Sequence, residues 1–211
     1  MKQNIVTVFG GAGFIGHNFA LELGRVGSKV MVVDNQVVNN LPGLVANFEI
    51  EALRHRVYMR FLLSRYELMR DLGVEMRHVD ARLLSDLASA VNDFQPDQIV
   101  HLSAISSAVE ARKNPGLCFD LQLITLRNVL ELCRERRTPV MFLSSSTVYG
   151  DFEKPTVDES ERPQPRGIYA NAKYMGERLV RAVFSNGQVQ HFEGARRAGL
   201  AAGGIGSARR A

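Results

Sequence analysis

The chain alternates short runs of apolar residues with longer stretches in which apolar residues recur every three or four positions. This alternation is typical of β-α-β units and predicts a parallel sheet covered by helices, a doubly wound α/β fold. The predicted strands are Ile5–Phe9, Lys29–Val33, Glu75–Val79, Gln98–Leu102 and Val140–Ser144. The predicted helices are Phe14–Val26, Val45–Leu72, Leu83–Phe94, Leu117–Arg136 and Tyr169–Phe184.

The predicted helix Val45–Leu72 is long for a connection between neighbouring strands. As one helix its 28 residues would reach about 40 Å. Its apolar residues fall near one face, whereas most of its arginines fall elsewhere. We expect it either to pack on the domain with a solvated basic face, or to break or project as a subunit-facing or substrate-facing element.

Composition changes after Phe184. Residues 185–211 contain six glycines and six alanines, and no strand-like apolar run is predicted among them. Such a segment buries too little apolar surface to order itself. We therefore expect one domain, residues 1–184, followed by a disordered tail, residues 185–211.

Charge and cysteine content narrow the class of protein. The net charge is +4. It falls to +1 without the tail, which holds four arginines and one glutamate, so no basic nucleic-acid surface is predicted. Cys118 and Cys133 have no metal-ligand or redox-pair spacing and are interpreted as reduced thiols of a cytoplasmic protein. No apolar stretch is long enough to span a membrane.

A glycine-rich turn directly follows the first predicted strand. Gly10, Gly13 and Gly16 are spaced three residues apart and lead into a predicted helix, whose free N–H groups can hold phosphates. Asp34 ends the second strand, eighteen residues past the last glycine. A carboxylate there accepts hydrogen bonds from the adenosine ribose and repels a 2′-phosphate. The pattern predicts a Rossmann-like domain that binds NAD in preference to NADP.

A second motif lies near the end of the predicted domain. Tyr169 and Lys173 are four residues apart and share one face of the last predicted helix. An ammonium beside a phenol favours the phenolate, so we expect Lys173 to lower the pKa of Tyr169 and make it a general base. A serine-rich segment, residues 144–146, ends the fifth strand and offers a hydroxyl to the same substrate oxygen.

Together these motifs resemble the extended short-chain dehydrogenase/reductase family, specifically its NAD-dependent epimerases and dehydratases. The similarity runs from about Asn4 to Phe184. It implies three catalytic residues, Ser145, Tyr169 and Lys173. The cofactor-binding residues that it implies are Gly10, Gly13, Phe14, Ile15, Gly16, Asp34, Asn35, Asp80, Ala81, Leu102, Ser103, Ala104, Tyr169 and Lys173. It implies a structural place for His101 and no metal, and Gln122 stands where the family usually has an asparagine.

The resemblance implies oxidation of a nucleotide sugar at C4, with a keto intermediate that is reduced again. A 4,6-dehydratase of this family carries an Asp-Glu pair right after the catalytic hydroxyl, where this chain has Ser146 and Thr147. Neither side chain can act as a carboxylic acid or carboxylate base. We therefore expect a nucleotide-sugar epimerase, and keep a dehydratase or reductase as an alternative.

The family's substrate site lies mostly in a C-terminal domain, and no segment after Phe184 matches it. We therefore expect a truncated chain with little epimerase activity of its own. The competing hypothesis is an NAD-binding module without turnover, which self-associates as a homodimer through the helices Leu117–Arg136 and Tyr169–Phe184.

Overall fold

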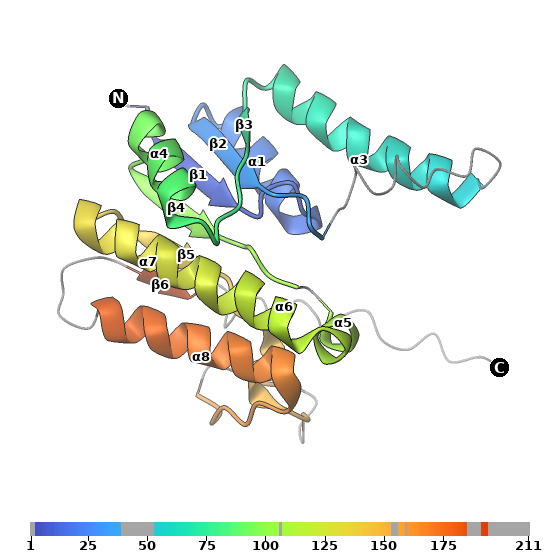
Figure 1. The fold of residues 1–211 in the computed structure, drawn as a ribbon, viewed down its shortest axis with the longest axis vertical. Helices are drawn as coiled ribbons and strands as arrows, with labels where there is room; N and C mark the ends of the chain where they lie inside the picture. Colours follow the sequence, from blue (N-terminus) through green and yellow to red (C-terminus); the bar gives the residue numbers. More distant parts are fainter. Residues whose placement is uncertain are drawn as a thin grey trace.

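The computed structural model describes residues 3–38, 53–105, 107–152, 156–158, 160–184 and 191–193. In this part of the chain six parallel strands form one sheet in the order β3-β2-β1-β4-β5-β6 (Figure 1). The strands are β1 Ile5–Phe9, β2 Lys29–Asp34, β3 Glu75–His78, β4 Gln98–His101, β5 Val140–Phe142 and β6 His191–Glu193. This strand order defines the doubly wound, Rossmann-like fold and confirms the predicted fold class.

Helices cover both faces of the sheet (Figure 1). They are α1 Phe14–Arg25, α3 Leu53–Asp71, α4 Leu84–Phe94, α5 Ala108–Lys113, α6 Pro115–Phe119, α7 Thr125–Arg136 and α8 Gly167–Phe184. A π-helical turn, η1 Asp120–Ile124, joins α6 to α7, and a 3₁₀ turn, η2 Ser146–Tyr149, follows β5. No helix in these described segments is both long and apolar enough to cross a bilayer.

The core has two layers because side chains of a strand alternate between the faces of the sheet. Val6 and Val8 of β1 pack with residues of α1 and α3. Phe9 of the same strand packs on the opposite face with residues of α4, α7 and α8. Strands buried on both faces are apolar almost throughout, which is why the sequence pattern located them.

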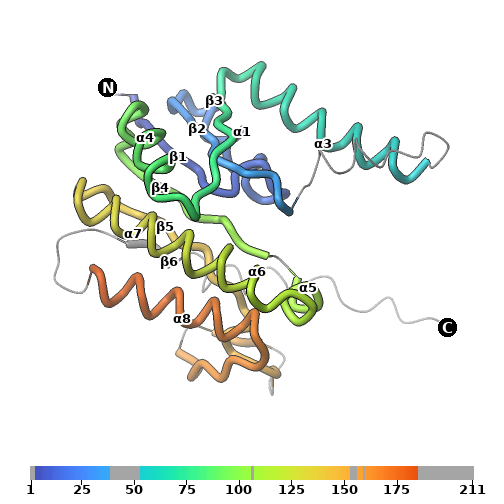
Figure 2. The backbone as a smooth tube through the Cα atoms, in the orientation of Figure 1, coloured from blue at the N-terminus to red at the C-terminus, as the bar shows by residue number. Residues whose placement is uncertain are grey.

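The long predicted helix is described from Leu53 to Asp71 as α3, and residues 45–52 of the prediction lie outside the described residues. Its later half packs on the domain and buries Leu62 and Met69. Its earlier half extends away from the sheet (Figure 2) and leaves Phe61 62% exposed. The expectation that the helix projects from the domain therefore holds for its earlier half, and the expectation that it packs on the domain holds for its later half.

Three further elements differ from the prediction. The single helix predicted for Leu117–Arg136 consists of α6, η1 and α7, which follow one another without a gap, and η1 differs from its neighbours in its backbone hydrogen bonds. The short helix α5 was not predicted. The prediction that no strand follows Phe184 was wrong, since β6 pairs in parallel with β5. This three-residue strand is too short to give a recognisable apolar run.

Candidate functional site

The glycine-rich turn connects β1 to α1 in a conformation that needs glycine. Gly10 has a φ of +73°, and a Cβ atom there would lie 2.7 Å from the backbone nitrogen of Ser103. A Cβ atom on Gly16 would lie 2.5 Å from the carbonyl oxygen of Gly10. The turn therefore packs directly against the segment after β4 and against the start of α1. This close packing leaves the helix N-terminus open to an anion.

Asp34 fastens the end of β2 to this turn. One carboxylate oxygen accepts a hydrogen bond from the backbone N–H of Ala12 at 3.0 Å, and the other accepts from the backbone N–H of Gln36 at 2.7 Å. Burial raises the pKa of Asp34, and both hydrogen bonds oppose that shift. Arg65 of α3 donates to the carbonyl oxygen of Ala12 at 3.3 Å. Side chains from two elements therefore hold the peptide groups of one residue in the turn.

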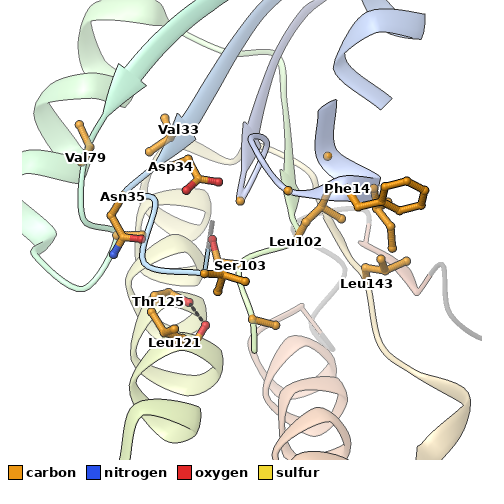
Figure 3. A pocket seen from close by; sticks show the side chains of 17 residues that line it. Phe14, Val33, Asp34, Asn35, Val79, Leu102, Ser103, Leu121, Thr125 and Leu143 are labelled. Atoms are coloured by element: carbon orange, nitrogen blue, oxygen red, sulfur yellow. Dashed lines mark hydrogen bonds between the residues drawn. The ribbon is translucent and has the colours of Figure 1, made fainter. Parts of the chain in front are cut away.

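A cavity of about 340 Å³ opens beside the turn and the ends of the central strands (Figure 3). Its volume lies within the range of small-molecule sites. The predicted cofactor-binding residues that line it are Gly10, Gly13, Phe14, Ile15, Gly16, Asp34, Asn35, Ala81, Leu102, Ser103 and Ala104. The fold therefore gathers residues from four separate segments of the chain around one cavity.

Other lining residues were not predicted: Val33, Val38, Val79, Leu121, Thr125 and Leu143. Val33, Val79 and Leu143 lie at or just after strand ends, so the strand pattern could have indicated them. Leu121 and Thr125 come from the π turn and the start of α7, and they lie below the strand ends in Figure 3. Only the packing of that helix on the sheet brings these two residues to the site.

Asp80 is held in an ion pair beside the cavity. Arg82 approaches both of its carboxylate oxygens, with Nε at 2.9 Å from one and 3.1 Å from the other. The hydrogen bonds from this guanidinium lower the pKa of Asp80. Its neighbours Val79 and Ala81 line the cavity, whereas Asp80 is absent from the described lining.

The three predicted catalytic residues come together where β5 ends against α8. The side chain of Ser145 acts on Tyr169 as a hydrogen-bond partner that favours a lower pKa of the phenol. Lys173 is 4% exposed, and its Nζ donates to the carbonyl oxygen of Leu143 at 2.8 Å. Because Leu143 also lines the cavity, this cluster lies at the cavity's edge. Thr147 adds a hydrogen bond from its hydroxyl to Ser145 Oγ at 3.0 Å.

The electrostatics of this cluster differ from the expectation. Burial raises the pKa of Tyr169, and the hydrogen bond with Ser145 only partly opposes it. Burial lowers the pKa of Lys173 to about 8. The prediction that Lys173 lowers the pKa of Tyr169 was wrong for this arrangement, because desolvation dominates and the ammonium is bonded to Leu143.

His101 is a fully buried residue at the end of β4. Its Nε2 is 3.0 Å from Thr125 Oγ1, which itself donates to the carbonyl oxygen of Leu121 at 2.9 Å. The imidazole therefore donates to Thr125. Burial, with a smaller effect of the Lys173 charge, lowers the pKa of His101 to about 3. Gln122 is also buried, and its side-chain amide donates to Cys118 Sγ at 3.1 Å.

The fold and the site define a class of protein: a dinucleotide-binding α/β domain with a tyrosine and a lysine beside its cavity. The family model described as the NAD dependent epimerase/dehydratase family matches residues 6–193. The chain belongs to this family of NAD-dependent enzymes, as the sequence motifs predicted. NAD is accordingly the cofactor of the family to which this fold belongs.

Individual relatives agree with this assignment. The chain is 31% identical to the bifunctional UDP-glucose 4-epimerase and UDP-xylose 4-epimerase 3 of Arabidopsis thaliana, over 87% of this chain and 48% of the relative. It is 32% identical to UDP-glucuronate 4-epimerase 1 of the same plant, over 83% of this chain and 38% of the relative.

Solved structures show the same fold. The UDP-glucose 4-epimerase of Thermus thermophilus in complex with NAD superposes with a TM-score of 0.69 at 25% identity. That match covers 89% of this chain and 53% of the solved chain. Here, as in most of these comparisons, the chain spans about half the length of the protein that it matches or less.

Proposed function

We propose that the chain binds NAD and takes part in the epimerisation of a nucleotide sugar at C4. The observation that carries the proposal is the cluster of Tyr169, Ser145 and Lys173 at the edge of the cavity. The 4-epimerases among its relatives support C4 as the reacting position. The glycine turn and Asp34 support NAD.

The residues around the cavity fit NAD. The turn at Gly10 and Gly16 has no room for side chains, so phosphates can approach the backbone and the start of α1. Asp34 lines the cavity where it can accept hydrogen bonds from ribose hydroxyls, and its neighbour Asn35 lies beside it (Figure 3). Leu102 and Leu143 offer apolar surface for a planar ring at the other end.

The roles of the three residues follow from their chemistry. Tyr169, once deprotonated, takes the proton of the sugar C4 hydroxyl, and Ser145 donates a hydrogen bond to the same oxygen. Because the pKa of Tyr169 is raised, this deprotonated form becomes more abundant as the pH rises above neutrality. The glycine turn and Asp34 would hold NAD, which would supply the acceptor for the C4 hydride and the donor for its return. Loss of the hydroxyl proton to Tyr169 and of the hydride from C4 would leave a 4-keto sugar. Tyr169 would then give its proton back to the sugar oxygen, and hydride return to the opposite face of C4 would complete the epimerisation.

The residues after Ser145 favour epimerisation over dehydration. Elimination of water needs an added acid and base, and Ser146 and Thr147 supply neither. Thr147 instead hydrogen-bonds Ser145 Oγ through its own hydroxyl and backbone N–H. This arrangement supports a cluster that only moves a proton between Tyr169 and the sugar oxygen.

The proposal is tested by measuring NAD binding by calorimetry and interconversion of UDP-glucose and UDP-galactose by NMR. UDP-glucuronate and UDP-xylose are assayed in the same way, since relatives carry these names. We expect NAD binding and an interconversion that Tyr169→Phe removes. Binding of NAD with no interconversion of any of these sugars would favour the NAD-binding module instead. Absence of NAD binding would contradict both hypotheses.

A further inference from the structure

Glu177 is a buried carboxylate that the proposed reaction does not use. It lies on α8 one turn after Lys173 and is 1% exposed. Ser144, also buried, donates a hydrogen bond from its hydroxyl to Glu177 Oε1 at 2.6 Å. A carboxylate in the core costs free energy unless it is hydrogen-bonded, so this bond gives Glu177 a defined place.

Glu177 continues the series that Tyr169 and Lys173 begin. The three residues are four positions apart, so their side chains leave one face of α8 at successive turns. All three bond to the segment that follows β5. The residues that they hold are successive in the chain: Leu143, Ser144 and Ser145.

A glycine permits this close approach of α8 to β5. A Cβ atom on Gly176 would lie 2.6 Å from Cζ of Phe142, a buried residue of β5. A larger residue there would push the helix away from the strand. Gly176 directly precedes Glu177, so the helix lies close to β5 next to the carboxylate that reaches Ser144.

We propose that Glu177 is a positioning residue, which fixes Ser144 and thereby holds the hydroxyl of the next residue, Ser145, against Tyr169. The backbone of Ser144 leads directly into Ser145, so fixing the first restricts the second. The effect of Glu177 on catalysis rests on the proposed function. Its effect on the position of Ser145 and Tyr169 does not, and the experiment measures that position separately.

Fluorine NMR reports the position of the Tyr169 ring without substrate or cofactor. The full chain is labelled with 3-fluorotyrosine at its five tyrosines, and Tyr169→Phe assigns the resonance. We expect Ser145→Ala to move this resonance, because it removes the hydrogen bond to Tyr169. Glu177→Ala and Ser144→Ala should move it in the same direction. Glu177→Gln keeps an oxygen for Ser144 and should leave the resonance near its wild-type position.

A matched control removes a hydroxyl from the same segment. Ser146→Ala leaves the bond between Ser144 and Glu177 intact and should not move the Tyr169 resonance. The double variant Ser144→Ala/Glu177→Ala should shift the resonance no further than either single variant, because each single variant already removes the hydrogen bond between Ser144 and Glu177. Ser144→Ala keeps the test available where Glu177→Ala fails to fold. A wild-type resonance in folded Glu177→Ala, or in Ser144→Ala, would overturn the proposal.

Kinetics separate this inference from the proposed function. In an active protein we expect Glu177→Ala to lower kcat by about 10- to 100-fold with little change in KM, as a misplaced catalytic group does. Glu177→Gln should restore most of the rate. If Tyr169→Phe keeps wild-type turnover, the proposed function fails, while the NMR result still decides the role of Glu177.

Discussion

The ammonium of Lys173 donates a hydrogen bond to the carbonyl oxygen of Leu143 at 2.8 Å, in the interior of the protein. Leu143 lines the cavity, so this bond places a buried positive charge at the cavity's edge. Burial lowers the pKa of Lys173 to about 8, from an ordinary value of 10.5. At neutral pH this buried ammonium therefore lowers the stability of the folded chain.

Lys173→Met should change how stability depends on pH. Between pH 8 and pH 10.5 the unfolded chain holds a proton on Lys173 that the folded chain lacks, so wild-type stability rises with pH through this window. Below pH 8 both states are charged, and the penalty is constant. We expect the stability difference between wild type and Lys173→Met to move by about 2–3 kcal/mol in favour of wild type between pH 7 and pH 10.

Urea unfolding at a series of pH values measures this difference. Lys113→Met provides the control, since Lys113 is an exposed lysine on α5. This variant controls for the replacement of a lysine by methionine as such. Lys173→Met should also weaken NAD binding. If the free energy of unfolding depended on pH in the same way in wild type and Lys173→Met, the ammonium of Lys173 would not be buried.

Tyr169→Phe tests the proposed base. The substitution removes only the phenolic oxygen and its bond with Ser145, and the ring can still pack against α6 and the neighbouring core. We expect NAD binding nearly as in the wild type and interconversion slower by about 10²- to 10⁴-fold, the usual contribution of a general base. Because the pKa of Tyr169 is raised, wild-type turnover should increase with pH above neutrality. Wild-type turnover in Tyr169→Phe would refute the assignment.

The sheet was predictable from the sequence because its strands are buried on both faces and therefore apolar. Val6 and Val8 face one layer of the core and Phe9 faces the other, so all three add to the run of apolar residues that marks the strand. β6 was not predictable, since its place depends on pairing with β5 and not on its own composition. The π turn was equally hidden, because it lies inside a continuous run of helix and differs from its neighbours only in its backbone hydrogen bonds.

For the site, spacing predicted which residues gather but not how their charges are satisfied. Asp34 follows a strand at a fixed distance from the glycine turn, and it lines the cavity as expected. Asp80 also follows a strand, yet Arg82 two residues later bonds its carboxylate. The spacing of Tyr169 and Lys173 gives a shared helix face, whereas the burial that sets both pKa values comes from the packing of α8 on the sheet.

Substitutions at Asp34 should narrow the preference for NAD over NADP. The carboxylate would lie against the 2′-phosphate of NADP, and like charges in contact disfavour binding. Asp34→Ala also removes the bonds to Ala12 and Gln36, so it should weaken binding of both cofactors. Asp34→Asn keeps one oxygen acceptor and isolates the effect of charge. We expect the affinity ratio, measured by calorimetry, to fall by about 10- to 100-fold in both variants. Equal affinities in the wild type would rule out this role.

Gly16→Ala should damage both the fold and NAD binding. The added Cβ would lie 2.5 Å from the carbonyl oxygen of Gly10 and from the Cα atom of Gly11, both of which are backbone atoms that cannot swing aside. We expect a loss of about 1–3 kcal/mol in stability, as for other overpacked sites, and no measurable NAD binding. Gly116→Ala is the matched control, because a Cβ there meets no atom within 4 Å. Its thermal midpoint and NAD affinity should stay close to wild type.

His101 should make the protein sensitive to mild acid. Its folded pKa of about 3 lies below the ordinary value of 6.5, so acid protonates the unfolded chain first. The stability that neutral His101 gives the folded chain is fully present above pH 6.5 and is lost as the pH falls towards 3. Between pH 7 and pH 5 we expect wild type to lose about 2 kcal/mol more than His101→Gln, which cannot titrate and can still donate to Thr125.

Thr125→Val separates the charge of His101 from its hydrogen bond. Removing the hydroxyl leaves the buried Nε2–H of His101 without its acceptor, which should cost about 1–3 kcal/mol at neutral pH. The imidazole remains buried and titratable, so the variant should keep the acid sensitivity that His101→Gln loses. Urea unfolding at pH 7 and pH 5 measures both effects. An identical loss of stability in wild type and His101→Gln would show that other groups cause the acid response.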